Sequence, residues 1–176
     1  YGGGRVLQAA IGQSDSVFSP LQMAEYAATL ANYGNRYSAS ILKTVRSYDY
    51  SEKVYERQDE VLSTVESPQY NWDAIHEGMK EVINSPLNET NYLNFYDCAV
   101  TVAGKTGTAQ KGEGIKNDGL FICYAPYEDP EIAVAVVVER GHAGASVGFI
   151  ARQIVDVYLN IRSYSNTSES EMSLLK

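Results

Sequence analysis

The chain has 176 residues, an apolar fraction of 44%, a charged fraction of 20% and a formal net charge of −8, which suits one globular domain with a hydrophobic core. No cluster of Lys or Arg offers a surface for nucleic-acid phosphates, and no apolar run approaches the roughly 20 residues that span a bilayer. We therefore expect a soluble unit with no transmembrane segment and no nucleic-acid partner.

The beginning of the chain predicts one helix after an irregular start. Tyr1 is followed by three glycines, with no initiator Met and no signal core, so we expect a piece of a longer protein. Ser19, Pro20 and Gln22 have the spacing of a helix N-cap, a first-turn proline and a capping-box partner. Gly34 supplies a C-terminal stop, which predicts a helix over residues 20–33.

The middle of the chain predicts a hairpin and a second helix. Residues 41–48 and 53–55 are rich in β-forming residues on either side of a turn, which indicates a peripheral hairpin. The second helix is expected to follow Asn71 as its cap and to end before Pro86. Its apolar residues recur at helical spacing: Trp72, Ile75, Met79, Val82 and Ile83.

The last third of the chain predicts an antiparallel sheet and a C-terminal helix. Strands are expected at residues 98–108, 120–125 and 132–139, and the third is apolar enough to be covered on both faces. The C-terminal helix is indicated by apolar residues at helical spacing: Phe149, Ile150, Ile154, Val157, Tyr158 and Ile161. The expected fold class is therefore α+β: a three-stranded antiparallel sheet with flanking helices and a C-terminal helix. Residues 163–176 lose all patterning, so we expect a disordered tail there.

The most informative string is Lys105-Thr106-Gly107-Thr108, at the end of a predicted strand. Lys supplies a positive charge for a carboxylate, threonine hydroxyls can donate to it, and glycine removes side-chain bulk beside the backbone. The free N–H groups of an edge strand can also pair with a peptide backbone. These four residues are candidate binding residues for a peptide that ends in a free carboxylate.

Two other kinds of site have less support. Gly104-Lys105-Thr106 imitates the end of a phosphate-binding P-loop, but Ala99 stands where that loop needs glycine and no helix is expected to follow. Nucleotide binding therefore remains a weaker alternative. Cys98 and Cys123 match no metal-binding spacing, so we expect two free, packed thiols and no metal.

Several strings together resemble one family. Ile11-Gly12-Gln13, the string from Ser19 to Ala24, and residues 104–110, 121–126 and 132–140 are similar, in order and spacing, to class B penicillin-binding proteins. The resemblance covers nearly all of residues 6–162 and leans toward the elongation-type, penicillin-binding protein 2-like branch. It implies that residues 1–162 form the C-terminal part of a transpeptidase domain, with a partial penicillin-binding/serine β-lactamase-like fold.

The resemblance also implies a function. In this family a serine of an SxxK motif is acylated by the stem peptide of peptidoglycan, an SxN motif assists proton transfer, and KTG binds substrate. Lys105 and Thr106 would then orient the substrate carboxylate, Gly107 would permit close approach, and Thr108 would supply a hydroxyl and an oxyanion-hole N–H. The longer protein would be a D,D-transpeptidase anchored in the cell membrane and acting outside it, with stem peptides and β-lactams as partners and no cofactor.

The nucleophile of such an enzyme is not expected in this chain. Ser40 and Lys43 match SxxK as text, but they stand on an extended segment, where residues three apart face opposite sides. Ser173 and Lys176 match it in the expected tail, and no Ser-x-Asn triplet occurs. We therefore predict no catalytic residue here and no activity of the chain alone, and we read His76 and His142 as packing or loop residues.

Two further expectations follow from these interpretations. A noncatalytic module that binds cell-wall peptides or a protein partner remains the alternative to a piece of an enzyme. The resembled fold pairs earlier strands with the last strand of its sheet, so residues 132–139 are expected to present an unpaired apolar edge. We expect the chain to hide that edge, either by self-association with a second copy through it or by folding its own termini over it.

Overall fold

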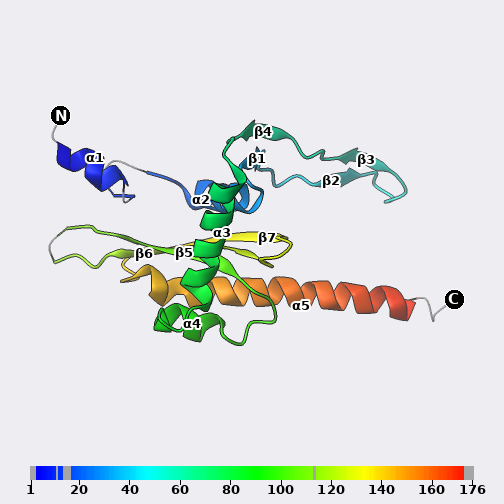
Figure 1. Cartoon of the computed structure of the whole chain (residues 1–176). Coiled ribbons are helices and arrows are strands. Elements are labelled where there is room, and N and C mark those ends of the chain that lie inside the picture. Colours follow the sequence, from blue (N-terminus) through cyan, green and yellow to red (C-terminus); the bar gives the residue numbers. More distant parts are fainter. Residues whose placement is uncertain (1–2, 11, 14–16, 113, 173–176) are drawn as a thin grey trace.

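The centre of the fold is a three-stranded antiparallel sheet with the order β5-β6-β7 (Figure 1). The computed structural model describes residues 3–10, 12–13, 17–112 and 114–172. The strands are β5 Ala103–Ala109, β6 Asp118–Ala125 and β7 Ile132–Val138. All three predicted strands are confirmed, although β5 begins later than expected because the Thr101 carbonyl accepts from the Tyr127 N–H outside the sheet.

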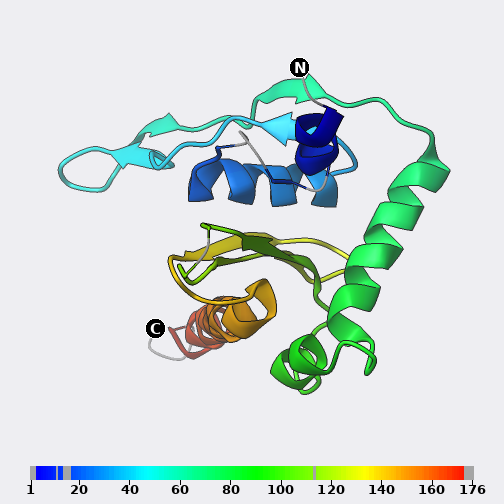
Figure 2. The ribbon, with the colours of Figure 1, turned by 90° about the vertical axis from the view of Figure 1, so that its left-hand side faces the viewer.

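Helices cover both faces of this sheet, which confirms the α+β class. Figure 2 shows the sheet between α2 (Pro20–Ala31) and α5 (Gly148–Met172). Successive residues of a strand face opposite sides, so Phe121 and Cys123 of β6 face α5 while Tyr124 faces α2. Burial raises the pKa of the Cys123 thiol to about 12, and both cysteines are free as predicted.

Two hydrophobic clusters result from this layering. On the α5 side the buried residues are Ile83, Phe95, Val102, Phe121, Cys123, Ala125, Val134, Val136, Val147, Ala151 and Val155. On the α2 side they are Leu30, Ala31, Trp72, Met79, Ala103 and Tyr124. The apolar run of β7 is therefore covered on both faces, as its composition predicts.

Helix α2 begins as predicted from its capping box. The Ser19 hydroxyl accepts from the Gln22 N–H at 3.2 Å, and the Gln22 side chain accepts from the Ser19 N–H at 2.9 Å. The helix ends at Ala31, where Tyr33 and Gly34 take left-handed backbone angles. A Cβ on Gly34 would also lie 2.5 Å from the Val65 carbonyl oxygen, so glycine is required there twice over.

Helix α3, Gln69–Asn84, confirms the second predicted helix but corrects its start and one part of its apolar face. It begins after Pro68, so Asn71 is not its cap; the Asn71 side chain donates to the Ser67 hydroxyl instead. Its buried side chains are Trp72, His76, Met79 and Ile83. Ile75 was expected on this face and is instead 39% exposed, because the i, i+4 row through His76 faces the sheet.

The C-terminal helix is confirmed, but its buried face differs from the prediction. The residues that pack on the sheet are Ala151 and Val155 of α5, together with Val147 just before the helix, whereas Ile154 and Val157 are 42% and 56% exposed. The backbone of α5 continues as helix past Ser163 to Met172, where a disordered tail was expected. Main-chain hydrogen bonding extends the helix there without an apolar pattern, and residues 173–176 lie outside the described residues.

The remaining elements are peripheral. The predicted hairpin is present as β2 Thr44–Arg46 and β3 Lys53–Glu56, and Figures 1 and 2 show it as an arm on the other side of α2 from the central sheet. Five elements among the described residues were not predicted: α1 Gly3–Ala10, α4 Glu89–Phe95, the 3-10 helix η1 Gly144–Val147, and the short antiparallel pair β1 Asn35–Tyr37 and β4 Val61–Thr64. No helix among the described residues combines the length and apolarity needed to cross a bilayer.

Candidate functional site

Strand β5 carries all four candidate binding residues at one edge of the sheet. Among the described strands β5 pairs only with β6, so its other edge has no strand partner. Helix α3 packs against its beginning, where a Cβ on Gly104 would lie 3.2 Å from Ile83 Cδ1. Further along, Lys105 and Thr108 are exposed and Thr106 and Gly107 half-buried, so this part of the edge is accessible.

The N–H and C=O groups of β5 point alternately toward β6 and toward the open edge. Gly107 is paired with Leu120 of β6, and a Cβ on Gly144 would lie 2.6 Å from Gly107 N and 2.3 Å from Leu120 O. These two backbone atoms are therefore close together, which places the polar groups of Gly107 on the side of β6. Carbonyl and N–H groups alternate direction from residue to residue. Those of Thr106 and Thr108 therefore face the open edge.

Side chains of the chain itself occupy both of these outward carbonyls. Lys105 Nζ donates to Thr106 O at 2.8 Å, and Gln13 Nε2 donates to Thr108 O at 2.8 Å. Sequence reasoning identified Lys105 but assigned no role to Gln13. The only signal for Gln13 was the Ile11-Gly12-Gln13 string, of which Ile11 lies outside the described residues.

The glycine-rich segment before α5 supports β5 from one side. The Gly144 N–H donates to Thr108 Oγ1 at 3.2 Å, and Gly144 packs directly on the backbone of Gly107. Gly119 of β6 lies against the same segment, since its Cβ would be 3.0 Å from the Ala143 carbonyl oxygen. The absence of side chains at these positions lets the loop reach the strand and hold the Thr108 hydroxyl.

A buried carboxylate holds the far end of the β5–β6 hairpin. Asp118 accepts from Lys111 Nζ at 2.7 Å and from the Arg140 N–H at 2.9 Å. The Lys111 ammonium, with help from the Arg140 N–H, holds the pKa of the Asp118 carboxyl below its usual value. This contact ties the turn after β5 to the end of β7.

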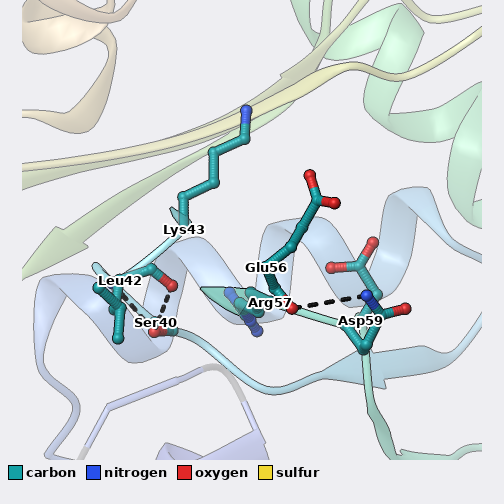
Figure 3. A pocket seen from close by; sticks show the side chains of 7 residues that line it. Ser40, Leu42, Lys43, Glu56, Arg57 and Asp59 are labelled. Atoms are coloured by element: carbon teal, nitrogen blue, oxygen red, sulfur yellow. Dashed lines mark hydrogen bonds between the residues drawn. The ribbon is translucent and has the colours of Figure 1, made fainter. Parts of the chain in front are cut away.

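The Ser40–Lys43 pair does not form a nucleophile–base arrangement. The Ser40 hydroxyl accepts from the Leu42 N–H at 3.1 Å and lies 3.2 Å from the Leu42 carbonyl oxygen. Figure 3 shows the amine of Lys43 extending away from Ser40. Both residues line a polar pocket of about 440 Å³ on the hairpin arm, together with Leu42, Glu56, Arg57, Gln58 and Asp59. Ser173 and Lys176 lie outside the described residues.

Neither histidine has a catalytic setting. His76 is 3% exposed, and its Nε2 is 2.8 Å from the Leu30 carbonyl oxygen and its Nδ1 3.0 Å from the Tyr124 hydroxyl. It stacks on Tyr33 at 4.3 Å, which agrees with a packing role. His142 lies in the loop after β7, where its backbone N–H donates to the Asn117 carbonyl.

The geometry also bears on other ligand classes. Gly104-Lys105-Thr106 lies inside a strand that runs on to Ala109, and no helix begins there, which is unlike a P-loop. Among the described residues, no three His, Cys, Asp or Glu side chains gather closely enough to hold a metal ion.

Comparison with known proteins decides the family. Residues 3–156 match the family model described as the penicillin-binding protein transpeptidase domain. The chain belongs to this family. The peptidoglycan D,D-transpeptidase MrdA of Haemophilus influenzae is 31% identical to this chain over 177 residues, covering 90% of the chain and 26% of MrdA. The predicted resemblance to penicillin-binding protein 2 is thereby confirmed.

Solved structures agree with this assignment. Penicillin-binding protein 2B of Streptococcus pneumoniae superposes with a TM-score of 0.78 at 26% identity, over 92% of this chain and 28% of that one. Penicillin-binding protein A of M. tuberculosis, an imipenem acyl-enzyme complex, superposes with a TM-score of 0.73 at 28% identity, over 86% of this chain and 33% of that one. The chain thus spans about a quarter to a third of the length of these three proteins.

Proposed function

We propose that this chain is the substrate-binding part of a peptidoglycan D,D-transpeptidase. The observation that carries the proposal is the exposed Lys105 on a strand whose open edge presents the backbone groups of Thr106 and Thr108. A cation beside the outward-facing N–H and C=O groups of a strand edge suits an extended peptide that ends in a carboxylate. The stem peptide of peptidoglycan is such a ligand, and β-lactams share its carboxylate.

Each of the four residues has a role in this proposal. Lys105 and the Thr106 hydroxyl orient the ligand carboxylate, and Gly107 leaves room for close approach. Thr108 supplies a hydroxyl, which the Gly144 N–H already orients, and an outward N–H for a developing oxyanion. The ligand backbone adds to β5 as a further strand.

The proposed chemistry is acyl transfer through a serine that this chain does not supply. The Ser40 hydroxyl is engaged by its own backbone and lacks a nearby base, so no described SxxK pair can act. The serine and its lysine would come from another part of a longer, membrane-anchored protein whose transpeptidase domain works outside the cytoplasmic membrane. By this proposal the chain alone binds the peptide but is not acylated by it.

A titration of the chain with acetyl-D-alanyl-D-alanine tests the proposal. Amide resonances of residues 105–108 should shift on binding, and Lys105→Ala should abolish the effect. Lys116→Ala is the matched control, because Lys116 is an exposed lysine in the connection between β5 and β6. Equal binding by the wild type and Lys105→Ala would refute the proposed site, and an adduct between the chain and penicillin in an intact mass spectrum would refute the absence of a nucleophile.

We also propose that the chain self-associates through β7. Among the described strands β7 pairs only with β6, and all seven of its residues are apolar. The groups of Val136 face β6 by the alternation described above, so those of Val137 face the open edge. Unpaired, apolar edges recruit further strands.

Light scattering tests the self-association. Val137→Pro removes one outward N–H without touching the ladder to β6, and should shift the chain toward monomer. Val137→Ala keeps the N–H and should leave the oligomer largely intact. A wild-type chain that stays monomeric at high concentration would contradict this part of the proposal.

A further inference from the structure

The side chain of Gln13 is bonded to the strand that we propose as the ligand site. Gln13 and Thr108 are 95 residues apart in the sequence, and Gln13 Nε2 donates to Thr108 O at 2.8 Å. The Thr108 carbonyl faces the open edge of β5. A carboxamide N–H therefore sits where the backbone N–H of an added strand would bind.

The end of helix α1 places Gln13 at this position. Gly12 has a φ of +78°, its N–H donates to Ala9 O at 3.0 Å, and the Gln13 N–H donates to Gln8 O at 2.9 Å. These two bonds form the Schellman motif, in which the residue after the last turn takes a left-handed conformation. A residue other than glycine rarely adopts that conformation, so Gly12 determines the direction in which Gln13 leaves the helix. The contact between Gln13 and β5 is thus held by a structured helix end.

The neighbouring outward carbonyl is occupied in the same way. Lys105 Nζ donates to Thr106 O, so both outward carbonyls in the accessible part of β5 accept from side chains of the chain itself. Side chains that cover an edge keep it from pairing with an unrelated strand. A ligand that adds to β5 has to exchange these contacts for its own.

We infer that Gln13 is a specificity-determining residue of this site, whose carboxamide competes with the ligand for the Thr108 carbonyl. The inference rests on the proposed function. A ligand displaces Gln13 efficiently only if it offers an N–H to Thr108 and, at the same time, a carboxylate to Lys105. The site therefore selects ligands that combine a terminal carboxylate with a backbone amide N–H, as N-acylated peptides do, and it selects against carboxylates that lack the amide N–H.

Two sets of measurements on the ¹⁵N-labelled chain test this inference. In the ligand-free chain, the side-chain amide protons of Gln13 should exchange with solvent more slowly than those of the exposed Gln110. Acetyl-D-alanyl-D-alanine should release the Gln13 amide and bring its exchange to the rate of Gln110. N-methylation of the first D-alanine removes the competing N–H from the probe and should prevent the release.

Variants give the second readout. Gln13→Ala and the similarly long Gln13→Met lack the donor, so both should bind acetyl-D-alanyl-D-alanine about 3- to 10-fold more tightly, the change that corresponds to one neutral hydrogen bond. Gln8→Ala is the matched control on the same helix end, because Gln8 contributes only its backbone carbonyl to the motif. If Gln13 only supported the local structure, its removal would disorder the site and weaken ligand binding. Tighter binding by the variants therefore distinguishes competition from a structural role.

The outcomes separate this inference from the proposed function. Unchanged or weaker binding by both Gln13 variants, with binding still abolished in Lys105→Ala, overturns the role of Gln13 and leaves the proposed function in place. Fast exchange of the Gln13 amide in the ligand-free chain overturns it as well. If Lys105→Ala binds the peptide as tightly as the wild type, or if no variant binds it, the proposed function is overturned and the inference with it.

Discussion

Gly144 lies so close to Gly107 that a Cβ on Gly144 would come within 2.4 Å of the Gly107 carbonyl oxygen. The loop before α5 and the candidate binding strand therefore touch through backbone alone, and the loop's N–H orients the Thr108 hydroxyl. Any side chain at residue 144 has to push β5 away from its place. This contact makes the loop a structural support of the site.

Gly144→Ala should therefore lower the free energy of unfolding by about 1–3 kcal/mol or more, the usual cost of forcing extra volume into a packed region. Gly78→Ala is the matched control: apart from the neighbouring backbone of helix α3 itself, no atom lies within 4 Å of its Cβ position, so alanine should stabilise the chain by about 0.5–1 kcal/mol. Urea unfolding of both variants measures the difference. Equal stability of Gly144→Ala and the wild type would show that the loop does not rest on β5.

Asp118 predicts a pH-dependent contribution to stability. Lys111 and the Arg140 N–H hold the pKa of its carboxyl lower in the folded chain than in the unfolded one. Such a group stabilises the fold above its unfolded pKa, and the stabilisation is lost as the pH falls through the folded pKa. Asp118→Asn should therefore be less stable than the wild type at about pH 7, and the difference should vanish once the pH falls below the lowered, folded-state pKa of Asp118.

Urea unfolding across this pH range checks the prediction. Asp129→Asn is the control, since it removes one negative charge from an exposed position between β6 and β7. A difference between Asp118→Asn and the wild type that stays constant from neutral to acid pH would mean that the ion pair with Lys111 does not contribute.

Helix α3 offers a test of which face packs on the sheet. Ile83 is fully buried beside Gly104, whereas Ile75 is 39% exposed. Ile83→Ala should cost about 2–5 kcal/mol of stability because it leaves a cavity. Ile75→Ala should cost less than about 1 kcal/mol, although the apolar spacing of the sequence places both residues on one stripe. Thermal unfolding distinguishes them, and similar losses for the two variants would contradict the observed face.

The sequence predicted the sheet and its covering helices well because their signals are local. The capping box at Ser19, the apolar run of β7 and the helical repeat after Gly148 each depend on residues a few positions apart. Lys105 could be identified in the same way, because the order of cation, hydroxyl and glycine is readable without a structure. The resemblance to penicillin-binding proteins included the strings around Ser19, Lys105 and β7.

What the sequence did not show depends on contacts between distant segments. The bond from Gln13 to Thr108 joins residues that only the folded chain brings together, and the packing of Gly144 on Gly107 depends on how the loop crosses the sheet. Strands β1 and β4 were missed because each is short and exposed and pairs across more than twenty residues. The predicted buried faces of α3 and α5 were partly wrong because each helix carries two neighbouring apolar stripes, of which only one faces the sheet.

The position along α5 at which packing against the rest of the fold ends is also not given by composition alone. Leu159 packs against the core cluster on the α5 side, whereas composition alone predicts a tail from residue 163. We propose that the packed unit ends near residue 162, even though the helical backbone of α5 continues beyond it. Hydrogen exchange of the amides of α5 would locate this limit, with strong protection at Val155 and little beyond Ser163.

Acylation of the longer transpeptidase that we propose to contain this chain tests the central claim most directly. Lys105 contributes a charged donor at the site where the ligand carboxylate binds, and losing one such donor typically lowers the rate by about 100- to 1,000-fold. The rate constant for labelling by a fluorescent penicillin should therefore fall by that factor in Lys105→Ala and stay unchanged in Lys116→Ala. Labelling of Lys105→Ala at the wild-type rate would contradict the claim that β5 forms a wall of the active site.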